Sequence, residues 1–130
     1  VPTTTGAAKA LTKIFPELAD VIGGCGIRVP VPNGSLTDIT FNVKKTRTIE
    51  EINDAFLYIS QNQLKNILYY TKDPIVSIDI NNSSYSCTFD SLMTSVIGKM
   101  VKIIGWYDNE TGYSNRIVDL INYLIDKKYV

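Results

Sequence analysis

The chain has 130 residues, 45% of them hydrophobic, and its 13 basic residues are balanced by 13 acidic residues. A chain of this length can build one domain-sized core, and its balanced, scattered charges exclude the strongly basic surface typical of proteins that bind nucleic acid or anionic membranes. It contains no histidine, which excludes a Ser–His–Asp triad, a Cys–His pair and an imidazole metal site within this chain.

Residues 2–18 predict the first helix. Thr3, Thr4, Thr5 and Gly6 precede an alanine-rich run, and Pro16 follows it. This pattern indicates a helix of about ten residues capped by Thr5 or Thr4. The unpaired N–H groups at a helix start can hold an anion, so Thr5 and Gly6 are candidate phosphate contacts. Simple capping is the commoner role of such threonines and is the alternative.

Residues 24–45 predict two strands joined by a turn at residues 32–35. In the second strand Ile39, Phe41 and Val43 alternate with polar side chains, so we expect a sheet with helices on one face only. In the first strand Arg28 lies among apolar residues, where an unpaired charge would be costly to bury. Its planar guanidinium suits a phosphate, and a carboxylate of the protein is the alternative partner.

The middle of the chain predicts one helix followed by short strands. Thr48 and Glu51 form a capping box, and apolar residues then recur at helical spacing, which predicts a helix over residues 49–60. Extended segments are expected at residues 67–70, 75–80 and 86–89, with a turn between the last two. Residues 100–107 predict a well-buried strand.

The end of the chain predicts a polar turn and a final helix. Residues 106–116 contain a strand end, polar turn residues and a helix start, and functional side chains gather at such junctions. The amide of Asn109 and the ring of Tyr113 would suit a planar ring that bears a carboxamide, whereas a tight turn with a helix cap is the alternative. The helix is expected to begin at Gly112 or Tyr113, and its apolar stripe needs a covering surface.

The order of these elements favours an α+β fold. Strands and helices follow one another without a regular βαβ alternation, so we expect a mostly antiparallel or mixed sheet with helices packed on one face. The apolar stretches are shorter than the roughly 20 residues of a membrane span, which indicates a soluble protein. Cys25 and Cys87 lack the setting of a disulfide-rich secreted scaffold, so we expect both to be reduced and buried in a cytoplasmic protein. Val1 is not a start methionine, and we expect further sequence upstream of it.

The chain resembles the C-terminal part of glyceraldehyde-3-phosphate dehydrogenases in four ordered motifs: PTTTGAAKA, RVPVPNGSLTD, LKNILYYTKDPIVSIDI and WYDNETGYSNRIVDL. The resemblance covers nearly the whole chain. It implies that residues 1–111 form part of a catalytic domain and that residues 112–130 form a C-terminal helix. This helix would dock on an N-terminal NAD-binding domain that, like the start of the catalytic domain, lies outside the chain. The resemblance also implies a homotetramer in which the sheets of the subunits face one another.

The resemblance assigns roles to the candidate residues. Thr5 and Gly6 would bind a phosphate oxygen, and Arg28 would hold inorganic phosphate or the phosphate of glyceraldehyde 3-phosphate. Asn109 would donate a hydrogen bond to the nicotinamide carboxamide, and Tyr113 would pack beside the ring. The implied cofactor is NAD, with NADP as the alternative, because the residues that discriminate between them belong to the nucleotide-binding domain.

The resemblance also implies that the reacting groups lie outside this chain. The family's nucleophilic cysteine and basic histidine belong to SCTTN and HATT motifs, which this sequence lacks. In the intact enzyme a thiolate would attack the aldehyde, hydride would pass to NAD, and phosphorolysis of the acyl-thioester would give an acyl phosphate. We therefore expect no catalytic residue and no metal site in this chain, and no dehydrogenase activity from it alone.

Two positions depart from the pattern of the family. Thr111 stands where the family usually carries a bulky aromatic residue, and Gly34 stands where a larger residue is common, so local packing should differ there. A related alternative is an erythrose-4-phosphate dehydrogenase, which shares these motifs. An alternative from another class is a non-catalytic interaction or ligand-binding module, against which the uncovered apolar stripe of the last helix argues.

Overall fold

The computed structural model describes residues 1–129. The chain divides into two compact units, Val1–Pro32 and Asn33–Val130. Among the described residues, no helix is long and apolar enough to cross a membrane.

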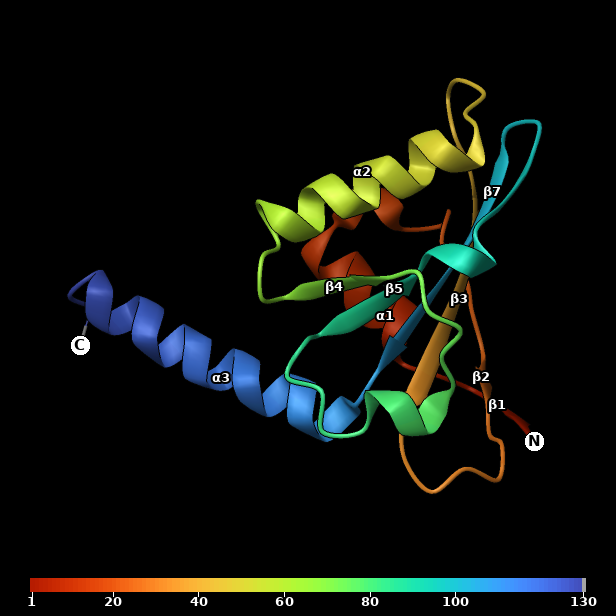
Figure 1. The fold of residues 1–130 in the computed structure, drawn as a ribbon. Helices are drawn as coiled ribbons and strands as arrows, with labels where there is room; N and C mark the ends of the chain where they lie inside the picture. Colours follow the sequence, from red (N-terminus) through yellow and green to blue (C-terminus); the bar gives the residue numbers. More distant parts are fainter. Residues whose placement is uncertain (130) are drawn as a thin grey trace. The chain divides into compact units, whose positions relative to one another are not determined.

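The first unit consists of a short antiparallel ribbon and a helix (Figure 1). Strand β1 (Pro2–Thr3) pairs with β2 (Gly26–Ile27). The first of the two predicted strands is thus only two residues long, and the prolines that follow it lack the N–H groups that would extend the ladder. Helix α1 (Ala7–Ile14) is followed by a 3-10 helix, η1 (Pro16–Leu18). The α-helix ends early because a proline disfavours helical backbone in the residue before it.

The start of α1 differs by one residue from the prediction. Gly6, rather than Thr5 or Thr4, is the N-cap, and its backbone lies in the right-handed helical region at φ −83° and ψ −6°. The Thr5 hydroxyl accepts a hydrogen bond from the Ala7 N–H at 3.3 Å. The threonine therefore supports the helix start from one position before the cap.

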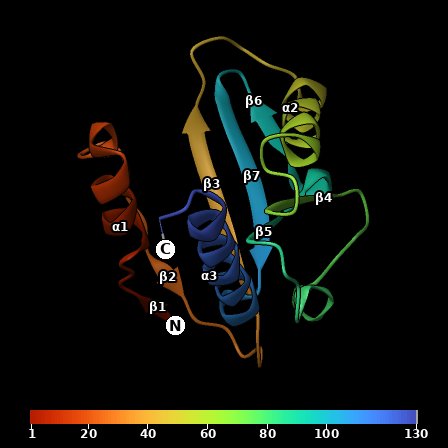
Figure 2. The same ribbon diagram turned by 90° about the vertical axis from the view of Figure 1, so that its left-hand side faces the viewer.

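The second unit is built on a mixed sheet (Figure 2). Its strands are β3 (Ser35–Asn42), β4 (Leu68–Thr71), β5 (Cys87–Asp90), β6 (Ser95–Ile97) and β7 (Met100–Tyr107). The order is β3-β7-β5-β4, and β6 also pairs with β7. Only the β4–β5 pair is parallel among the described strands. The α+β fold with a mostly antiparallel, mixed sheet is therefore confirmed.

Helix α2 (Ile49–Gln61) begins as the capping box predicts. The Thr48 hydroxyl accepts from the Glu51 N–H at 3.2 Å, and the Glu51 carboxylate accepts from the Thr48 N–H at 2.8 Å. The apolar side of the helix then packs on the sheet, where the ring of Phe56 stacks on Phe89 with centroids 4.0 Å apart. Local capping and the hydrophobic period agree here, so this element was predictable from sequence.

One predicted strand is wrong. Residues 75–80 were expected to be extended, but Ser77–Ile80 form a 3-10 helix, η2. The Asp79 carboxylate accepts a hydrogen bond from the Val76 N–H at 2.8 Å. Such a local contact between a side chain and the backbone competes with strand pairing. A second short 3-10 helix, η3 (Ser91–Met93), follows β5.

The core of the second unit is small and centred on the sheet. Its buried apolar side chains are Leu68, Ile80, Phe89, Val101 and Ile104. Three of these belong to β5 and β7, so the interior of the sheet is the most protected part of the unit. The predicted strand over residues 100–107 is confirmed as β7, but it is less buried than expected, because only Val101 and Ile104 are buried.

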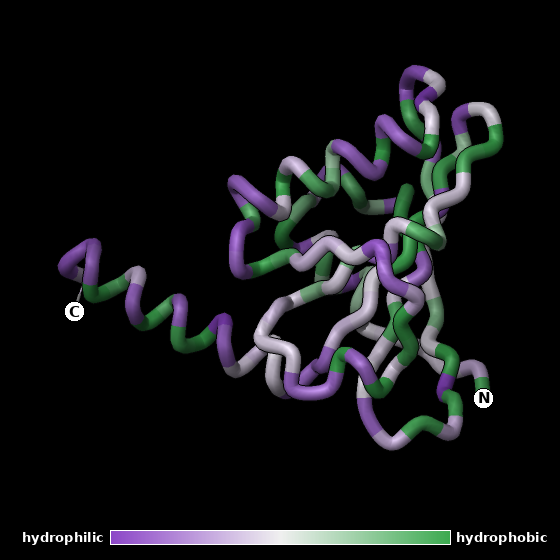
Figure 3. The backbone as a smooth tube through the Cα atoms, in the orientation of Figure 1, coloured by the Kyte–Doolittle hydropathy of each residue, from purple (hydrophilic) through white to green (hydrophobic). Residues whose placement is uncertain are grey.

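Helix α3 (Asn109–Asp126) leads away from the sheet (Figure 1). It begins at Asn109 and not at Gly112 or Tyr113, because Asp108 is its N-cap and accepts from the Thr111 N–H at 2.9 Å. Figure 3 shows apolar residues recurring along this helix. Ile117, Leu120 and Ile121 are 42%, 56% and 49% exposed. The docking of this stripe on a nucleotide-binding domain remains a prediction.

Candidate functional site

The candidate phosphate residues all lie in the first unit. The Arg28 N–H donates to the Val1 carbonyl oxygen at 2.9 Å, and the Val1 nitrogen donates to the Arg28 carbonyl oxygen at 2.6 Å. Arg28 thus continues the ladder in which Thr3 pairs with Gly26. Because directly paired residues of antiparallel strands share a face, and so do alternate residues along each strand, Arg28 lies on the same face as Thr3.

Gly26 leaves room for the Thr3 side chain on the opposite strand of the ribbon. A Cβ at this position would lie 2.9 Å from the Thr3 hydroxyl oxygen, which is closer than ordinary packing allows. The ribbon thereby connects Arg28 to the segment that leads into Thr5 and Gly6. All three candidate residues are exposed. Their convergence on one anion remains a prediction.

The start of α1 has features that suit an anion. No acidic residue lies in its first turn, and the first N–H groups of a helix have no partner within the helix. The space around Gly6 is open, since an added Cβ would meet no atom within 4 Å. A phosphate oxygen at this position would meet backbone N–H groups and the positive end of the helix dipole.

The candidate nicotinamide residues lie in the second unit, where Asp108 organises the start of α3. Asp108 is buried, with 2% of its surface exposed. One oxygen accepts from the Thr111 N–H at 2.9 Å, and the other accepts from the Asn82 N–H at 2.9 Å and from the Asn33 amide at 3.0 Å. The backbone hydrogen bonds from Thr111 and Asn82 lower the pKa of Asp108, while burial opposes them. The aspartate is therefore held ionised at the junction of three segments.

Asn109 follows Asp108 as the first residue of α3. Its side-chain oxygen accepts a hydrogen bond from the Ser35 hydroxyl at 2.6 Å. This contact uses the acceptor end of the amide, so the two N–H groups of the other end are the donors that remain. An exposed amide with unused donors fits the carbonyl oxygen of a carboxamide.

Tyr113 lies on the same face of α3 as Asn109. Residues four apart on a helix are neighbours on its surface, and Tyr113 is 69% exposed. Between them, Gly112 is buried, and a Cβ at this position would lie 2.9 Å from the Tyr85 carbonyl oxygen. The missing side chain thus lets the first turn of α3 approach the chain at residue 85. An aromatic ring beside an amide is the pair expected for a planar ring that bears a carboxamide.

The turn before β3 explains why Gly34 occurs where a larger residue is common. Its φ is +90°, and a Cβ would lie 2.8 Å from the Ile80 side chain and 3.2 Å from the Ser77 carbonyl oxygen. A positive φ and this close approach both favour glycine. Local packing therefore accounts for this departure.

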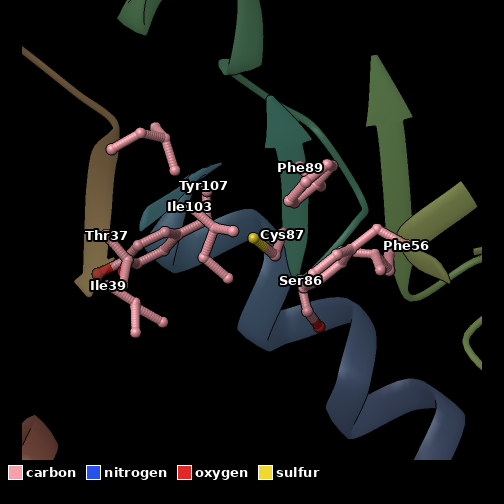
Figure 4. Close-up of a pocket in the computed structure, with 11 residues that line it drawn as sticks. Thr37, Ile39, Phe56, Ser86, Cys87, Phe89, Ile103 and Tyr107 are labelled. Carbon is pink, nitrogen blue, oxygen red and sulfur yellow. The ribbon is translucent and has the colours of Figure 1, made fainter. Parts of the chain in front are cut away.

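The two cysteines have different environments, and Cys87 lacks the features of a nucleophile. Cys25 is exposed, which corrects the expectation that it is buried, and both cysteines are free. Cys87 lines a largely apolar cavity of about 290 Å³ against β3 and β7 (Figure 4). Burial raises the pKa of its thiol to about 11, so it stays protonated at neutral pH. Within residues 1–129, no three His, Cys, Asp or Glu side chains gather as metal ligands would.

Sequence reasoning proposes Asn109 and Tyr113 as ligand contacts, and it does not single out Ser35 and Asp108, which hydrogen-bond at the same helix start. Asp108 was detectable as a helix cap, because aspartate is among the preferred residues at that position. Ser35 was not, because it lies 74 residues from Asn109 in the sequence. Only the pairing of β3 with β7, in which Ser35 opposes Tyr107, brings the two together.

Comparisons with known proteins agree with the resemblance. The family model described as "Glyceraldehyde 3-phosphate dehydrogenase, C-terminal domain" matches residues 1–109. The glyceraldehyde-3-phosphate dehydrogenase of Geobacillus stearothermophilus is 50% identical over 128 residues, which are 98% of this chain and 38% of that protein. Glyceraldehyde-3-phosphate dehydrogenase 2 of Streptomyces avermitilis is 54% identical over 121 residues, or 92% of this chain and 36% of the relative. The chain therefore spans less than two fifths of the length of these relatives.

Proposed function

The chain belongs to the family of glyceraldehyde 3-phosphate dehydrogenase C-terminal domains, and we propose that it supplies the phosphate and nicotinamide contacts of a phosphorylating, NAD-dependent enzyme of this kind. The intact enzyme oxidises glyceraldehyde 3-phosphate in glycolysis or gluconeogenesis, with inorganic phosphate as the second substrate and an acyl phosphate as the product. The nucleophile and the base belong to parts of the protein outside this chain. The residues of this chain bind and orient the phosphate and the nicotinamide ring.

The phosphate contacts are Thr5, Gly6 and Arg28. The Arg28 guanidinium provides positive charge and a planar pair of donors that match two oxygens of a phosphate. The start of α1 at Gly6 provides backbone N–H groups, and the Thr5 hydroxyl adds a short polar side chain. A substrate phosphate held by both the Arg28 guanidinium and the start of α1 would place the aldehyde end of the substrate at a fixed distance from the reacting groups.

The nicotinamide contacts are Asn109 and Tyr113. NAD, when bound, accepts a hydride at its nicotinamide ring. The Asn109 amide donates to the carboxamide oxygen of the ring and so fixes which face and edge of the ring meet the substrate. Tyr113 offers an aromatic surface one helical turn further along and keeps water from that side of the ring. The residues present suit NAD, and NADP is the alternative, since both carry the same ring.

The observation that carries this proposal is the state of the Asn109 amide. Its acceptor end is occupied by the Ser35 hydroxyl at 2.6 Å, which leaves its two N–H groups as the remaining donors, and an exposed tyrosine stands four residues later. The start of α3 does not need the Asn109 side chain as its cap. Here the cap is Asp108.

The intact protein is proposed to be a cytoplasmic homotetramer. On the polar side of β3, Asp38 forms an ion pair with Lys102 of β7 at 2.7 Å. Both side chains are about half exposed, and this surface is the proposed site of contact between the sheets of two subunits. The apolar stripe of α3 is the proposed contact with the NAD-binding domain of the same subunit in the intact protein.

The test is to assay the full-length protein that contains this segment. It should reduce NAD with glyceraldehyde 3-phosphate only when inorganic phosphate is present, and its kcat/KM should be lower with erythrose 4-phosphate. A preference for erythrose 4-phosphate would assign the protein to the related dehydrogenase. Absence of turnover with both aldehydes and with both NAD and NADP would favour a non-catalytic module and overturn the proposal.

A further inference from the structure

We propose that Asn33 is a site of spontaneous deamidation, and that its conversion to aspartate or isoaspartate loosens the start of α3. Asn33 and Gly34 form the only Asn–Gly pair in the sequence. The Asn33 side-chain amide donates a hydrogen bond to Asp108, the buried N-cap of α3, at 3.0 Å. This modification needs no cofactor and no substrate, so it does not rest on the proposed function of the chain.

The reaction is intramolecular and consumes only water. The backbone nitrogen of Gly34 loses its proton and attacks the side-chain carbonyl carbon of Asn33. The new C–N bond closes a succinimide ring, while the bond from that carbon to the side-chain nitrogen breaks. The departing nitrogen takes up a proton and leaves as ammonia. A water molecule then opens the ring, and depending on which carbonyl it attacks, the product is aspartate or isoaspartate, whose backbone is one carbon longer.

Sequence and structure both make Asn33 the favoured site. Gly34 has no side chain, so nothing attached to its own backbone shields its nitrogen from the neighbouring carbonyl carbon. Asn33 and Gly34 lie in a bend before β3 and belong to no helix or strand, so their backbone is not fixed by a regular hydrogen-bond ladder. Asn33 is half-buried, which leaves it in reach of water. The positive φ of Gly34 favours glycine, so the turn itself maintains the Asn–Gly pair.

Conversion to aspartate replaces an attraction at Asp108 by a repulsion. The Asp108 oxygen that accepts from the Asn33 amide also accepts from the Asn82 N–H at 2.9 Å. An aspartate at position 33 has no N–H group to donate and adds a negative charge beside this oxygen. Asp108 is 2% exposed, so water screens the repulsion poorly. The cap of α3 therefore loses a hydrogen-bond partner and gains a like charge.

Conversion to isoaspartate also changes the backbone. The extra carbon lies between residues 33 and 34, directly before β3. There is little room at this point, since even an added Cβ on Gly34 would lie 2.8 Å from the Ile80 side chain. Protein interiors are close-packed, so a longer backbone has to displace its neighbours. Both products thus act on the junction at which Asp108 accepts from the Thr111 N–H at 2.9 Å and begins α3.

The first experiment ages the full-length protein in mildly alkaline buffer, below its unfolding temperature, because the attacking nitrogen must lose a proton. Peptide mass spectrometry over time locates each converted asparagine, and Asn33 should convert first. The closest internal comparison is Asn82, which precedes a serine and also lies outside the helices and strands. Asn33→Gln should abolish the conversion at this position, because closure of a larger ring is slower. Conversion of Asn82 ahead of Asn33, or conversion of Asn33 only after unfolding, would overturn the proposal.

The second experiment tests the effect on α3 with the variant Asn33→Asp of the full-length protein. Amide hydrogen exchange over residues 108–116 should become about tenfold faster, as for the loss of one hydrogen bond to a charged group. The converted fraction of the aged protein should show the same increase. Asn42→Asp adds the same charge at an exposed position at the far end of β3 and should leave this exchange unchanged.

A double variant tests whether the effect passes through Asp108. Asn33→Asp combined with Asp108→Asn should speed the exchange by less than the product of the two single effects, because only one carboxylate then remains at the junction. Unchanged exchange in Asn33→Asp, or independent effects in the double variant, would overturn the link between Asn33 and the start of α3. Neither measurement uses NAD or an aldehyde, so failure of the proposed function would leave the result intact.

Discussion

At the scale of single residues, the proposed ligand contacts depend on which end of a side chain the protein itself uses. Asn109 gives its oxygen to Ser35 and keeps its donors, whereas the oxygens of Asp108 are taken up by Thr111, Asn82 and Asn33. Of these two adjacent polar residues, Asn109 thus keeps donors for a ligand, whereas Asp108 stabilises the fold. The sequence shows the residue types but not this division, because Ser35, Asn33 and Asn82 are far from residues 108 and 109 in the chain.

Asn109→Asp in the full-length enzyme should weaken NAD binding and lower turnover. The substitution keeps the shape and the acceptor for Ser35 but removes both N–H donors. We expect a loss of about five- to hundredfold in kcat/KM, as for a lost hydrogen bond at a ligand. NAD titration and thermal unfolding measure the two effects separately. A carboxylate at a helix start suits the helix dipole, so the substitution itself should not unfold the helix. Unchanged NAD use together with lower stability would show that Asn109 has only a structural role.

Arg28→Lys should raise the KM for inorganic phosphate despite the retained charge. The lysine ammonium cannot present two coplanar donors to two phosphate oxygens, and we expect a change of about tenfold, as for the loss of one charged hydrogen bond. Arg47→Lys is the matched control, because Arg47 forms an exposed ion pair with Glu51 on α2. Equal phosphate kinetics in both variants would remove Arg28 from the phosphate site.

At the scale of elements, the sequence predicted best where the signals were local. The capping box of α2 and the period of its apolar residues lie within the helix itself, and the helix was correct within one residue. The pattern of apolar residues predicts a strand where the 3-10 helix η2 forms, because the local hydrogen bond from the Val76 N–H to Asp79 competes with strand pairing. The predicted start of α3 is too late because the polar residues after Asp108 resemble a turn, whereas they form the first turn of the helix.

Stability should depend on pH through Asp108. Hydrogen bonds hold its pKa below the ordinary value of 3.8 in the folded protein. A lowered folded pKa means that the carboxylate stabilises the fold above its unfolded pKa, and that this contribution is lost as pH falls through the folded pKa. Asp108→Asn should therefore lower Tm at pH 7, and the gap from the unmodified protein should narrow below about pH 4. A gap that stays constant from pH 7 to pH 3 would contradict this role.

Gly112→Ala should destabilise α3 although alanine favours helices. The gain in helix propensity is about 1 kcal/mol, but the new Cβ would lie 2.9 Å from a backbone carbonyl oxygen at Tyr85, and overpacking costs about 1–3 kcal/mol. We expect a net loss of up to about 2 kcal/mol in the free energy of unfolding. The control is Gly24→Ala, where an added Cβ meets no atom within 4 Å. Equal stability of the two variants would show that α3 can move aside.

At the scale of the whole molecule, the chain exposes more apolar surface than its small core explains. Several large apolar side chains of α3 are about half exposed, and the relatives are more than twice as long as this chain. Contiguous exposed apolar residues mark surfaces that bind other parts of a protein. The sequence predicted this stripe from its period, and the surface proposed to cover it is the NAD-binding domain of the intact protein.

The polypeptide of residues 1–130 alone should not reduce NAD with glyceraldehyde 3-phosphate and phosphate. It has no histidine to act as a base, and the Cys87 thiol, with its pKa raised to about 11, is a poor nucleophile at neutral pH. Cys25 is exposed, but the chain has no histidine that could take up the proton of its thiol. The measurement is NADH formation by the purified polypeptide beside the full-length enzyme at equal molarity. Turnover that scales with the polypeptide and disappears in a Cys25→Ser, Cys87→Ser variant would show that the chain carries its own nucleophile, and the division between binding and reacting segments would then be wrong.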